Sequence, residues 1–270
     1  MDVGLVLPFS GQPFEPAATV RAAAATGVRD VWLRDWPRGE PAHADHGTGH
    51  DPLMYACQLA EILPPTTGGI GFAVLRLDFR EVAVLARSIA SAVSFSRRSL
   101  RLGFGMRRRP GPEGYAELAA RWQRLRELLD QDAGRADFAL PPGYTRPPFY
   151  LCSSARESWN AIDFAAEGWL AGEQHPREIA ATRAWLANRA PDLRVVMQVQ
   201  VVVDLHDPRS LRRTESGLVT CGTGRLRQLA TAWRDSGVDH VIYRPPLGSG
   251  IDHLRAFIET VGEVRLECAR

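Results

Sequence analysis

One nine-residue stretch of the chain, HADHGTGHD, has the density of polar side chains that a metal site or an acid–base site requires. It contains three imidazoles, from His43, His46 and His50, and two carboxylates, from Asp45 and Asp51. Imidazole and carboxylate together suit zinc. However, Asp51 precedes a proline as a helix N-cap would, and the Gly-Thr-Gly between the histidines predicts a loose loop. We therefore expect no metal, which leaves a solvated loop without a role or one histidine that reaches a pocket.

Composition excludes several other kinds of chemistry. The 270 residues include 33 basic ones, all of them arginine, so the chain has no Schiff-base lysine, P-loop lysine or lysine general base. The 31 acidic residues are interspersed with the basic ones, and the net charge is only +2. No basic surface for nucleic acid is predicted. We expect neither nucleic acid nor a membrane as a partner.

The cysteines and the N-terminus indicate where the protein works. The four cysteines are scattered without a C-x-x-C pair, which argues against a zinc ribbon and against a disulfide scaffold. The N-terminal residues MDVGLVLPFSG lack the basic start of a signal peptide, and no apolar run is long enough to span a membrane. We therefore expect a cytoplasmic protein with reduced thiols.

The elements that must position the polar residues alternate between two patterns. Short apolar runs are typical of strands buried on both faces of a parallel sheet. They are predicted at Val3–Pro8, Asp30–Arg34, Gly69–Leu77, Ser99–Gly105, Pro148–Ser153, Gly168–Gly172, Arg194–Asp204 and Asp239–Pro245. Between and after them helical patterns are predicted at Pro16–Thr26, Pro52–Leu63, Glu81–Val93, Gly114–Leu129, Ala155–Glu167, Pro176–Asn188, Arg225–Ser236 and Ile251–Val261.

Eight strand–helix units predict an α/β protein with a single (β/α)8 TIM barrel over residues 1–270. A doubly wound open sheet is the alternative. Two turn-rich stretches, Gly134–Pro147 and Leu205–Gly224, are long for barrel loops and are expected to be decorated loops within the alternation. Chemistry in a barrel is expected where strands end and the following loops begin.

Three segments carry motifs whose order and spacing are specific. The first is DPLMYACQLAEILPPTTGGIGFAVLRLDFREVAVLARSIASAVSFSRRSLRLGFGMR. The second is PPFYLCSSARESWNAIDFAAEGWL, and the third is TGRLRQLATAWRDSGVDHVIYRP. Together they cover most of the chain and resemble the bacterial luciferase-like monooxygenases. The resemblance implies a barrel that holds a reduced flavin at the carboxyl ends of its strands. The cofactor is FMN in the luciferase branch and the deazaflavin coenzyme in the reductase branch.

The resemblance also implies which residues contact that cofactor. It places a non-proline cis peptide beneath the isoalloxazine ring at Ala73 and Val74, with Gly105 at the end of the neighbouring strand. It places the cofactor phosphate at Ser153 and Ser154, although serine is also expected before a helix without any anion. The phosphate-contacting arginine falls near Arg107, the first of three consecutive arginines, of which at most one is expected to face the phosphate.

The chain departs from the family pattern at the end of the second predicted strand. Many members have an acidic residue there, followed by the histidine taken as catalytic, whereas this chain reads LRDWPRG, with Asp35 followed by Trp36. If a histidine of HADHGTGHD serves instead, we expect it to be His50, because His50 lies beside the predicted helix start. The catalytic candidates are therefore His50 and Asp35.

The function expected from this resemblance is that of a monooxygenase. It would use reduced FMN from a separate flavin reductase, together with O2, to oxygenate a small organic substrate. A deazaflavin-dependent oxidoreductase that transfers a hydride is one alternative, and a catalytically inactive flavin-binding barrel, suggested by Trp36, is another. Family members are commonly dimers, so the resemblance also implies a homodimer.

Overall fold

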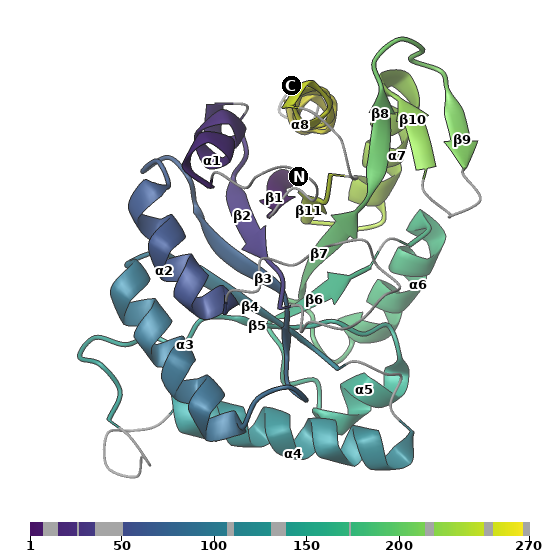
Figure 1. Ribbon diagram of the computed structural model, residues 1–270. Helices are drawn as coiled ribbons and strands as arrows, with labels where there is room; N and C mark the ends of the chain where they lie inside the picture. Colours follow the sequence, from purple (N-terminus) through teal and green to yellow (C-terminus); the bar gives the residue numbers. More distant parts are fainter. Residues whose placement is uncertain are drawn as a thin grey trace.

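Eight parallel strands close into a barrel in the order β1-β11-β7-β6-β5-β4-β3-β2 (Figure 1). The computed structural model describes residues 1–7, 16–25, 27–35, 51–106, 111–130, 139–172, 174–213, 219–245 and 251–266. The barrel strands are β1 (Asp2–Val6), β2 (Asp30–Leu33), β3 (Gly69–Arg76), β4 (Leu100–Gly105), β5 (Phe149–Leu151), β6 (Gly168–Ala171), β7 (Arg194–Val199) and β11 (His240–Tyr243). The predicted TIM barrel is confirmed, and the open doubly wound sheet is wrong.

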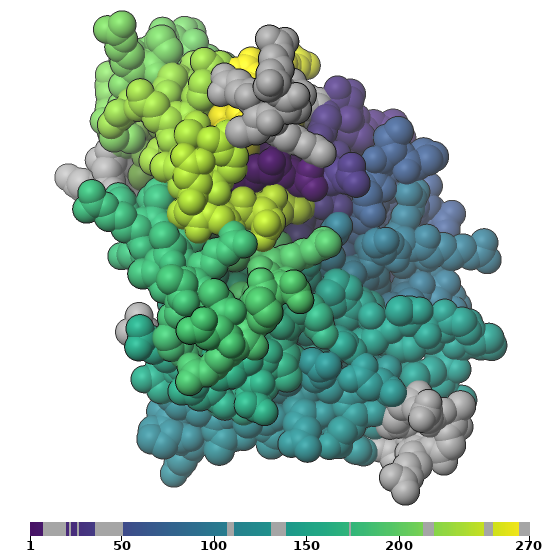
Figure 2. All heavy atoms as spheres, turned by 180° about the vertical axis from the view of Figure 1, so that it is seen from behind, coloured from purple at the N-terminus to yellow at the C-terminus, as the bar shows by residue number. Residues whose placement is uncertain are grey.

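Helices follow the strands and cover the outside of the barrel (Figure 1). They are α1 (Pro16–Ala25), α2 (Pro52–Ile62), α3 (Val82–Ser96), α4 (Pro112–Leu129), α5 (Arg156–Ala161), α6 (Pro176–Ala187), α7 (Thr223–Asp235) and α8 (Ile251–Leu266). Seen from behind, the dark purple start of the chain lies beside yellow-green residues, as the pairing of β1 with β11 requires (Figure 2). None of the helices that the structure describes is long and apolar enough to cross a membrane.

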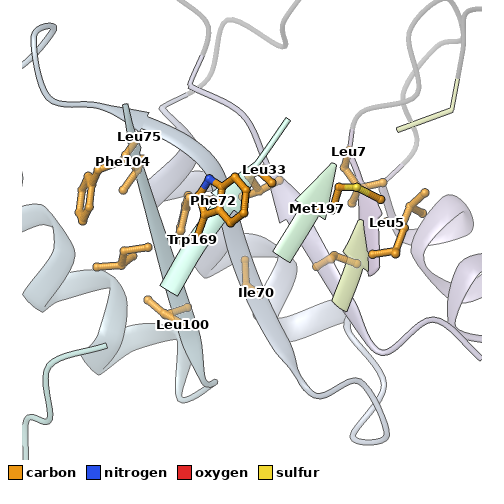
Figure 3. Close-up of a cluster of buried hydrophobic side chains, with 14 of the residues drawn as sticks. Leu5, Leu7, Leu33, Ile70, Phe72, Leu75, Leu100, Phe104, Trp169 and Met197 are labelled. Atoms are coloured by element: carbon orange, nitrogen blue, oxygen red, sulfur yellow. The ribbon is translucent and has the colours of Figure 1, made fainter. Parts of the chain in front are cut away.

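The larger of two cores lies between the strands and the helices. Alternate strand residues such as Leu5, Phe72 and Trp169 are fully buried there (Figure 3). Phe104 of β4 meets Trp122 of α4 edge to face, with 5.7 Å between the ring centroids. The period-two alternation of a strand explains this arrangement, because every second side chain faces the helices and the others face the barrel interior.

The barrel interior is filled by two large aromatic side chains. Trp32 and Tyr150 are buried there with their ring centroids 6.5 Å apart. Neighbouring strands make room with glycine: a Cβ at Gly71 would lie 2.2 Å from the Trp32 ring, and a Cβ at Gly168 would lie 2.0 Å from the Tyr150 ring. Glycines opposite the large rings therefore let both rings pack inside the barrel.

A buried polar group lies where the strands begin. The carboxylate of Asp30 is fully buried and accepts a hydrogen bond of 2.8 Å from Arg101. His240 Nδ1 lies 3.5 Å from the other oxygen of Asp30. Desolvation and the nearby Arg101 charge lower the pKa of His240 to about 3, so this imidazole is neutral at physiological pH. Desolvation also raises the pKa of Asp30, although Arg101 opposes that shift.

The connection after β7 differs from the prediction. The predicted strand Arg194–Asp204 divides at Gln200, and the stretch 205–224, expected to be a loop, contains two further strands. A three-stranded sheet is formed by β8 (Val201–Asp204), β9 (Leu211–Arg213) and β10 (Val219–Gly222), with β10 parallel to β8 and antiparallel to β9. Valines lie on both sides of Gln200, so the composition of the run did not reveal the division.

Side chains from the last strand and helix of the barrel hold β8 outside it. The Tyr243 hydroxyl donates to the Val201 carbonyl at 2.9 Å. His253 Nδ1 of α8 lies 2.8 Å from the Val203 carbonyl oxygen. Both contacts join residues at least 42 positions apart, so they depend on the folded barrel.

One predicted helix boundary, the start of α2, is confirmed, and another, the end of α5, is wrong. The predicted N-cap at Asp51 is confirmed, since its Oδ1 accepts from the backbone N–H of Leu53 at 2.9 Å and of Met54 at 3.2 Å. Helix α5, predicted to reach Glu167, ends at Ala161. The chain turns there because Asp163 and Phe164 adopt the left-handed conformation, with φ of 50° and 55°.

The packing of Trp32 against β3 can be tested with two Gly→Ala variants. We expect Gly71→Ala to lower the free energy of unfolding by at least about 1–3 kcal/mol, because the new methyl group overlaps the Trp32 ring. The control is Gly262→Ala in α8, where no atom lies within 4 Å and helix propensity predicts a gain of about 0.5–1 kcal/mol. Denaturant unfolding measures both, and equal stabilities would contradict the described interior packing.

Candidate functional site

A cavity of about 760 Å³ opens where β4 and β5 end. It is bounded by the ends of these strands and by the first residues of α4 and α5, including Tyr115 and Glu157. Three of the residues predicted to bind the cofactor, Gly105, Ser153 and Ser154, line it together. The cavity is within the size range of ligand sites, and it lies at the end of the barrel where active sites are found.

Local hydrogen bonds fix the turn that carries the two serines. The Ser153 hydroxyl oxygen accepts from the Ala155 backbone N–H at 3.1 Å and lies 2.9 Å from the Ser158 hydroxyl. The Ser153 carbonyl accepts from the Trp159 indole N–H at 3.0 Å. Ala155, not a serine, is the N-cap of α5. The Ser153 hydroxyl is therefore held in a defined turn at the cavity wall, and Ser154 follows it in the same turn.

The end of β3 adjoins this cavity. The expected non-proline cis peptide is present between Ala73 and Val74, where the pairing of β3 with β4 shifts by one position. A Cβ at Gly105 would lie 3.3 Å from Val74 Cγ2 and 3.5 Å from Cys152 Cβ. Val74, predicted beneath the ring, thus lies beside Gly105, which lines the cavity together with Ser153 and Ser154.

Cys152 is a residue of this region that sequence reasoning did not select. It is solvent-accessible and lines the cavity beside Ser153. Desolvation by the surrounding protein raises the pKa of the Cys152 thiol to about 11. The thiol is therefore protonated at neutral pH and offers a weak donor toward a bound ligand.

Asp35 lies at the wall of the mouth and is held by several hydrogen bonds. The Asp35 side chain is only 4% exposed. It accepts from the Arg76 backbone N–H at 3.1 Å, and Arg80 donates to both of its oxygens, through Nη2 at 3.1 Å and through Nη1. The Asp35 backbone N–H also donates to the Val74 carbonyl at 3.1 Å. Asp35 therefore fastens the end of β2 to the end of β3.

Arg80 also binds a second carboxylate. Its Nη2 donates to Asp51 Oδ2 at 2.9 Å, while the other Asp51 oxygen caps α2. Desolvation lowers the pKa of Arg80, but its hydrogen bonds and ion pairs with Asp35 and Asp51 outweigh that effect and raise the pKa above the ordinary value. One guanidinium thus joins the residue that ends β2 to the residue that begins α2. Arg80 lies 45 residues from Asp35, so no local sequence signal identified it.

Several predicted site residues lie outside the part of the chain that the structure describes. These are the three histidines His43, His46 and His50, together with Trp36 and Arg107. Their predicted roles stay predictions. Within the described ranges, no group of three or more His, Cys, Asp or Glu side chains is arranged to hold a metal ion.

The sequence matches no protein-family model and no curated protein. Solved structures do match over nearly the whole chain. An F420-dependent secondary alcohol dehydrogenase in complex with an F420–acetone adduct has a TM-score of 0.74 at 12% identity, covering 96% of this chain and 98% of that chain. The EDTA monooxygenase from Chelativorans sp. BNC1 has a TM-score of 0.75 at 12% identity, covering 99% and 94%.

A third match is the monooxygenase RslO1 from Streptomyces bottropensis, with a TM-score of 0.71 at 16% identity and 100% of both chains covered. The chain therefore has the same fold as these enzymes, a closed barrel of eight parallel strands surrounded by helices. At 12–16% identity the likeness is one of fold, so the reaction has to be argued from the site.

The Arg80 ion pairs give a stability prediction. Arg80→Met leaves the Asp35 carboxylate buried without its cationic partner, and we expect the free energy of unfolding to fall by about 3 kcal/mol or more. The double variant Asp35→Asn with Arg80→Met removes the unpaired charge and should recover part of that loss. Denaturant unfolding of both variants checks this, and a double variant no more stable than Arg80→Met would contradict the charge explanation.

Proposed function

We propose that the protein is a flavin-dependent monooxygenase that uses reduced FMN and O2 to oxygenate a small organic substrate. The observation that carries this proposal is the cavity of about 760 Å³ that Gly105, Ser153 and Ser154 line together at the barrel mouth. The fold is compatible with it, since the solved structures with this fold include two whose titles name monooxygenases. A separate flavin reductase in the cytoplasm would supply the reduced cofactor.

The residues of the cavity fit such a cofactor. Ser153 and Ser154 present hydroxyls for a phosphate, and Arg107 is the expected cationic contact. Gly105 has no side chain to fill the space between Val74 and Cys152, which leaves a surface on which a flat ring can lie. A bound reduced flavin supplies the electrons that activate O2. The chain binds and orients the reactants and keeps water away from them.

Proton transfer is assigned to His50, and Asp35 is assigned a supporting role. His50 directly precedes Asp51, which Arg80 holds beside Asp35. His50 would donate or accept a proton at the oxygen of the reacting substrate. The Asp35 oxygens already accept hydrogen bonds from Arg80 and from the Arg76 backbone, so Asp35 acts as a positioning residue for this wall.

Two alternative functions are distinguishable by experiment. A structure of an F420-dependent alcohol dehydrogenase has the same fold with a TM-score of 0.74, which supports hydride transfer with a deazaflavin as the second candidate. Trp36 at the position of the family's catalytic histidine supports a third, a barrel that binds the cofactor without turnover. The three candidates differ in cofactor selectivity and in the need for O2.

A cofactor titration tests the proposal. We expect the purified protein to bind reduced FMN more tightly than oxidised FMN or the deazaflavin, and Arg107→Ala to weaken binding by about tenfold through loss of a charged hydrogen bond. The control is Arg212→Ala on strand β9, away from the barrel mouth. Calorimetry gives the affinities. Selective binding of the deazaflavin with anaerobic turnover would replace the proposal by the second candidate, and binding without turnover would replace it by the third.

We also propose that the protein is a homodimer that associates through α2 and α3. Three large apolar side chains of these helices, Met54, Val84 and Phe95, are 73%, 59% and 69% exposed. The two helices contain one charged residue each, Glu61 and Arg87, whereas α4 contains six. Depletion of charge together with exposed large apolar side chains is typical of protein–protein interfaces.

The dimer proposal predicts the effect of a charge in this surface. We expect Phe95→Glu to convert the dimer into a monomer, because an unpaired carboxylate would be buried at the interface. The control is Leu211→Glu on β9, where a leucine is also 51% exposed but lies in the small side sheet. Analytical ultracentrifugation of the wild type and both variants provides the measurement. A dimer that is unaffected by Phe95→Glu would place the interface elsewhere.

A further inference from the structure

A buried hydroxyl lies behind Ser153 at the wall of the cavity. It belongs to Ser158 of α5, a residue that is only 2% exposed, and it lies 2.9 Å from the Ser153 hydroxyl. Both serines line the cavity of about 760 Å³ at the ends of β4 and β5, and Ser153 is the less buried of the two. A contact between two hydroxyls has a direction, because one of them donates and the other accepts.

Burial decides which of the two hydroxyls donates. Among the residues that the structure describes, the Ser158 hydroxyl has no hydrogen-bond partner other than Ser153. If it accepted a hydrogen bond from Ser153, its own proton would be buried without an acceptor, at a cost in stability. The Ser158 hydroxyl therefore donates, and the Ser153 oxygen accepts.

The Ser153 oxygen then has both of its lone pairs in use. It accepts from the Ala155 backbone N–H at 3.1 Å and from the Ser158 hydroxyl. A hydroxyl group has two lone pairs and one proton, so the remaining hydrogen-bonding capacity of Ser153 is its own proton. Because the Ala155 N–H is used inside the turn, the turn presents the Ser153 proton to the cavity in its place.

The backbone of Ser153 is fixed by the residue that follows Ser158. The indole N–H of Trp159 donates to the Ser153 carbonyl at 3.0 Å, and Trp159 is fully buried. Its ring stacks on Phe164 with 6.4 Å between the centroids. Consecutive residues of α5 thus hold the hydroxyl and the carbonyl of one serine. Ser153 cannot turn a lone pair toward the cavity without losing a contact with this buried support.

A carboxylate of the cavity wall, that of Glu157, is a competing acceptor for the Ser153 proton. Glu157 lines the same cavity and is exposed. It lies in the first turn of α5, where an acidic side chain is favoured by the helix dipole. Within the described part of the chain no hydrogen bond joins it to Ser153. The Ser153 proton is therefore available to a ligand.

We propose that Ser158 is a positioning residue that makes Ser153 a hydrogen-bond donor to an oxyanion, the phosphate of the cofactor. This inference rests on the proposed function, which places that cofactor in the cavity. A phosphate oxygen accepts the Ser153 proton in a charge-assisted hydrogen bond. A ligand group that can only donate, such as an ammonium, is excluded from this position, because both lone pairs of Ser153 are occupied.

The test compares reduced FMN with reduced riboflavin, which has the same ring and a hydroxyl in place of the phosphate. Anaerobic calorimetry gives the ratio of the two affinities. We expect Ser153→Ala to lower the FMN-to-riboflavin ratio by about tenfold and Ser158→Ala to lower it by about threefold. In the double variant Ser158→Ala should add no further loss, because Ser158 acts through Ser153.

Two further variants and a control complete the design. Ser158→Cys keeps a side chain of similar size with a weaker donor and should give an intermediate ratio. Glu157→Gln should leave the effect of Ser158→Ala unchanged. The control is Ser96→Ala at the end of α3, where a serine is also buried, at 4% exposure, and accepts from the Arg98 N–H at 3.4 Å.

Each outcome is judged on variants whose circular dichroism matches that of the wild type. A ratio unchanged in both Ser158 variants, or a further loss in the double variant, would overturn the positioning role and leave the proposed cofactor intact. Loss of the Ser158→Ala effect in the Glu157→Gln background would make Glu157 the acceptor and overturn the inference. Equal binding of FMN and riboflavin by the wild type would remove the phosphate from Ser153. A protein that binds neither ligand would reject the proposed cofactor itself.

Discussion

The space inside an eight-stranded barrel is the constraint on which the rest of this structure depends. Such a barrel encloses only enough volume for its own side chains. Trp32 and Tyr150 are the largest side chains of the interior cluster, and Gly71 and Gly168 accommodate their rings. Below them the Asp30–Arg101 pair lies where the strands begin. A ligand therefore has no place in the interior and must lie at the mouth, above the aromatic layer.

A second constraint is the attachment of the mouth wall to the barrel. Arg80 binds Asp35 after the end of β2 and Asp51 at the start of α2. Asp35 in turn accepts a hydrogen bond from the backbone of Arg76, the last residue of β3. Both ends of the intervening segment are therefore set by one guanidinium. This arrangement also gives Asp35 a structural reason to be acidic, whichever side chain follows it in the sequence.

The mouth brings small and weakly polar residues together at one place. Glycine, serine and cysteine border the cavity at β4 and β5, where they leave room and offer weak donors. This grouping follows from strand order, because β4 and β5 pair directly although a long segment separates them in the sequence.

The sequence by itself determined the features that depend on local periodicity and local chemistry. The alternation of apolar runs with helical patterns predicted the barrel, and Asp51 before Pro52 predicted the start of α2. Only the tertiary structure decided the division of the long run at Gln200, because the side chains of Tyr243 and His253 bind the backbone of β8 outside the barrel. It likewise placed Arg80 beside both Asp35 and Asp51. Strand and helix patterns repeat within a few residues, whereas these contacts join distant residues and form only when the eight strands close.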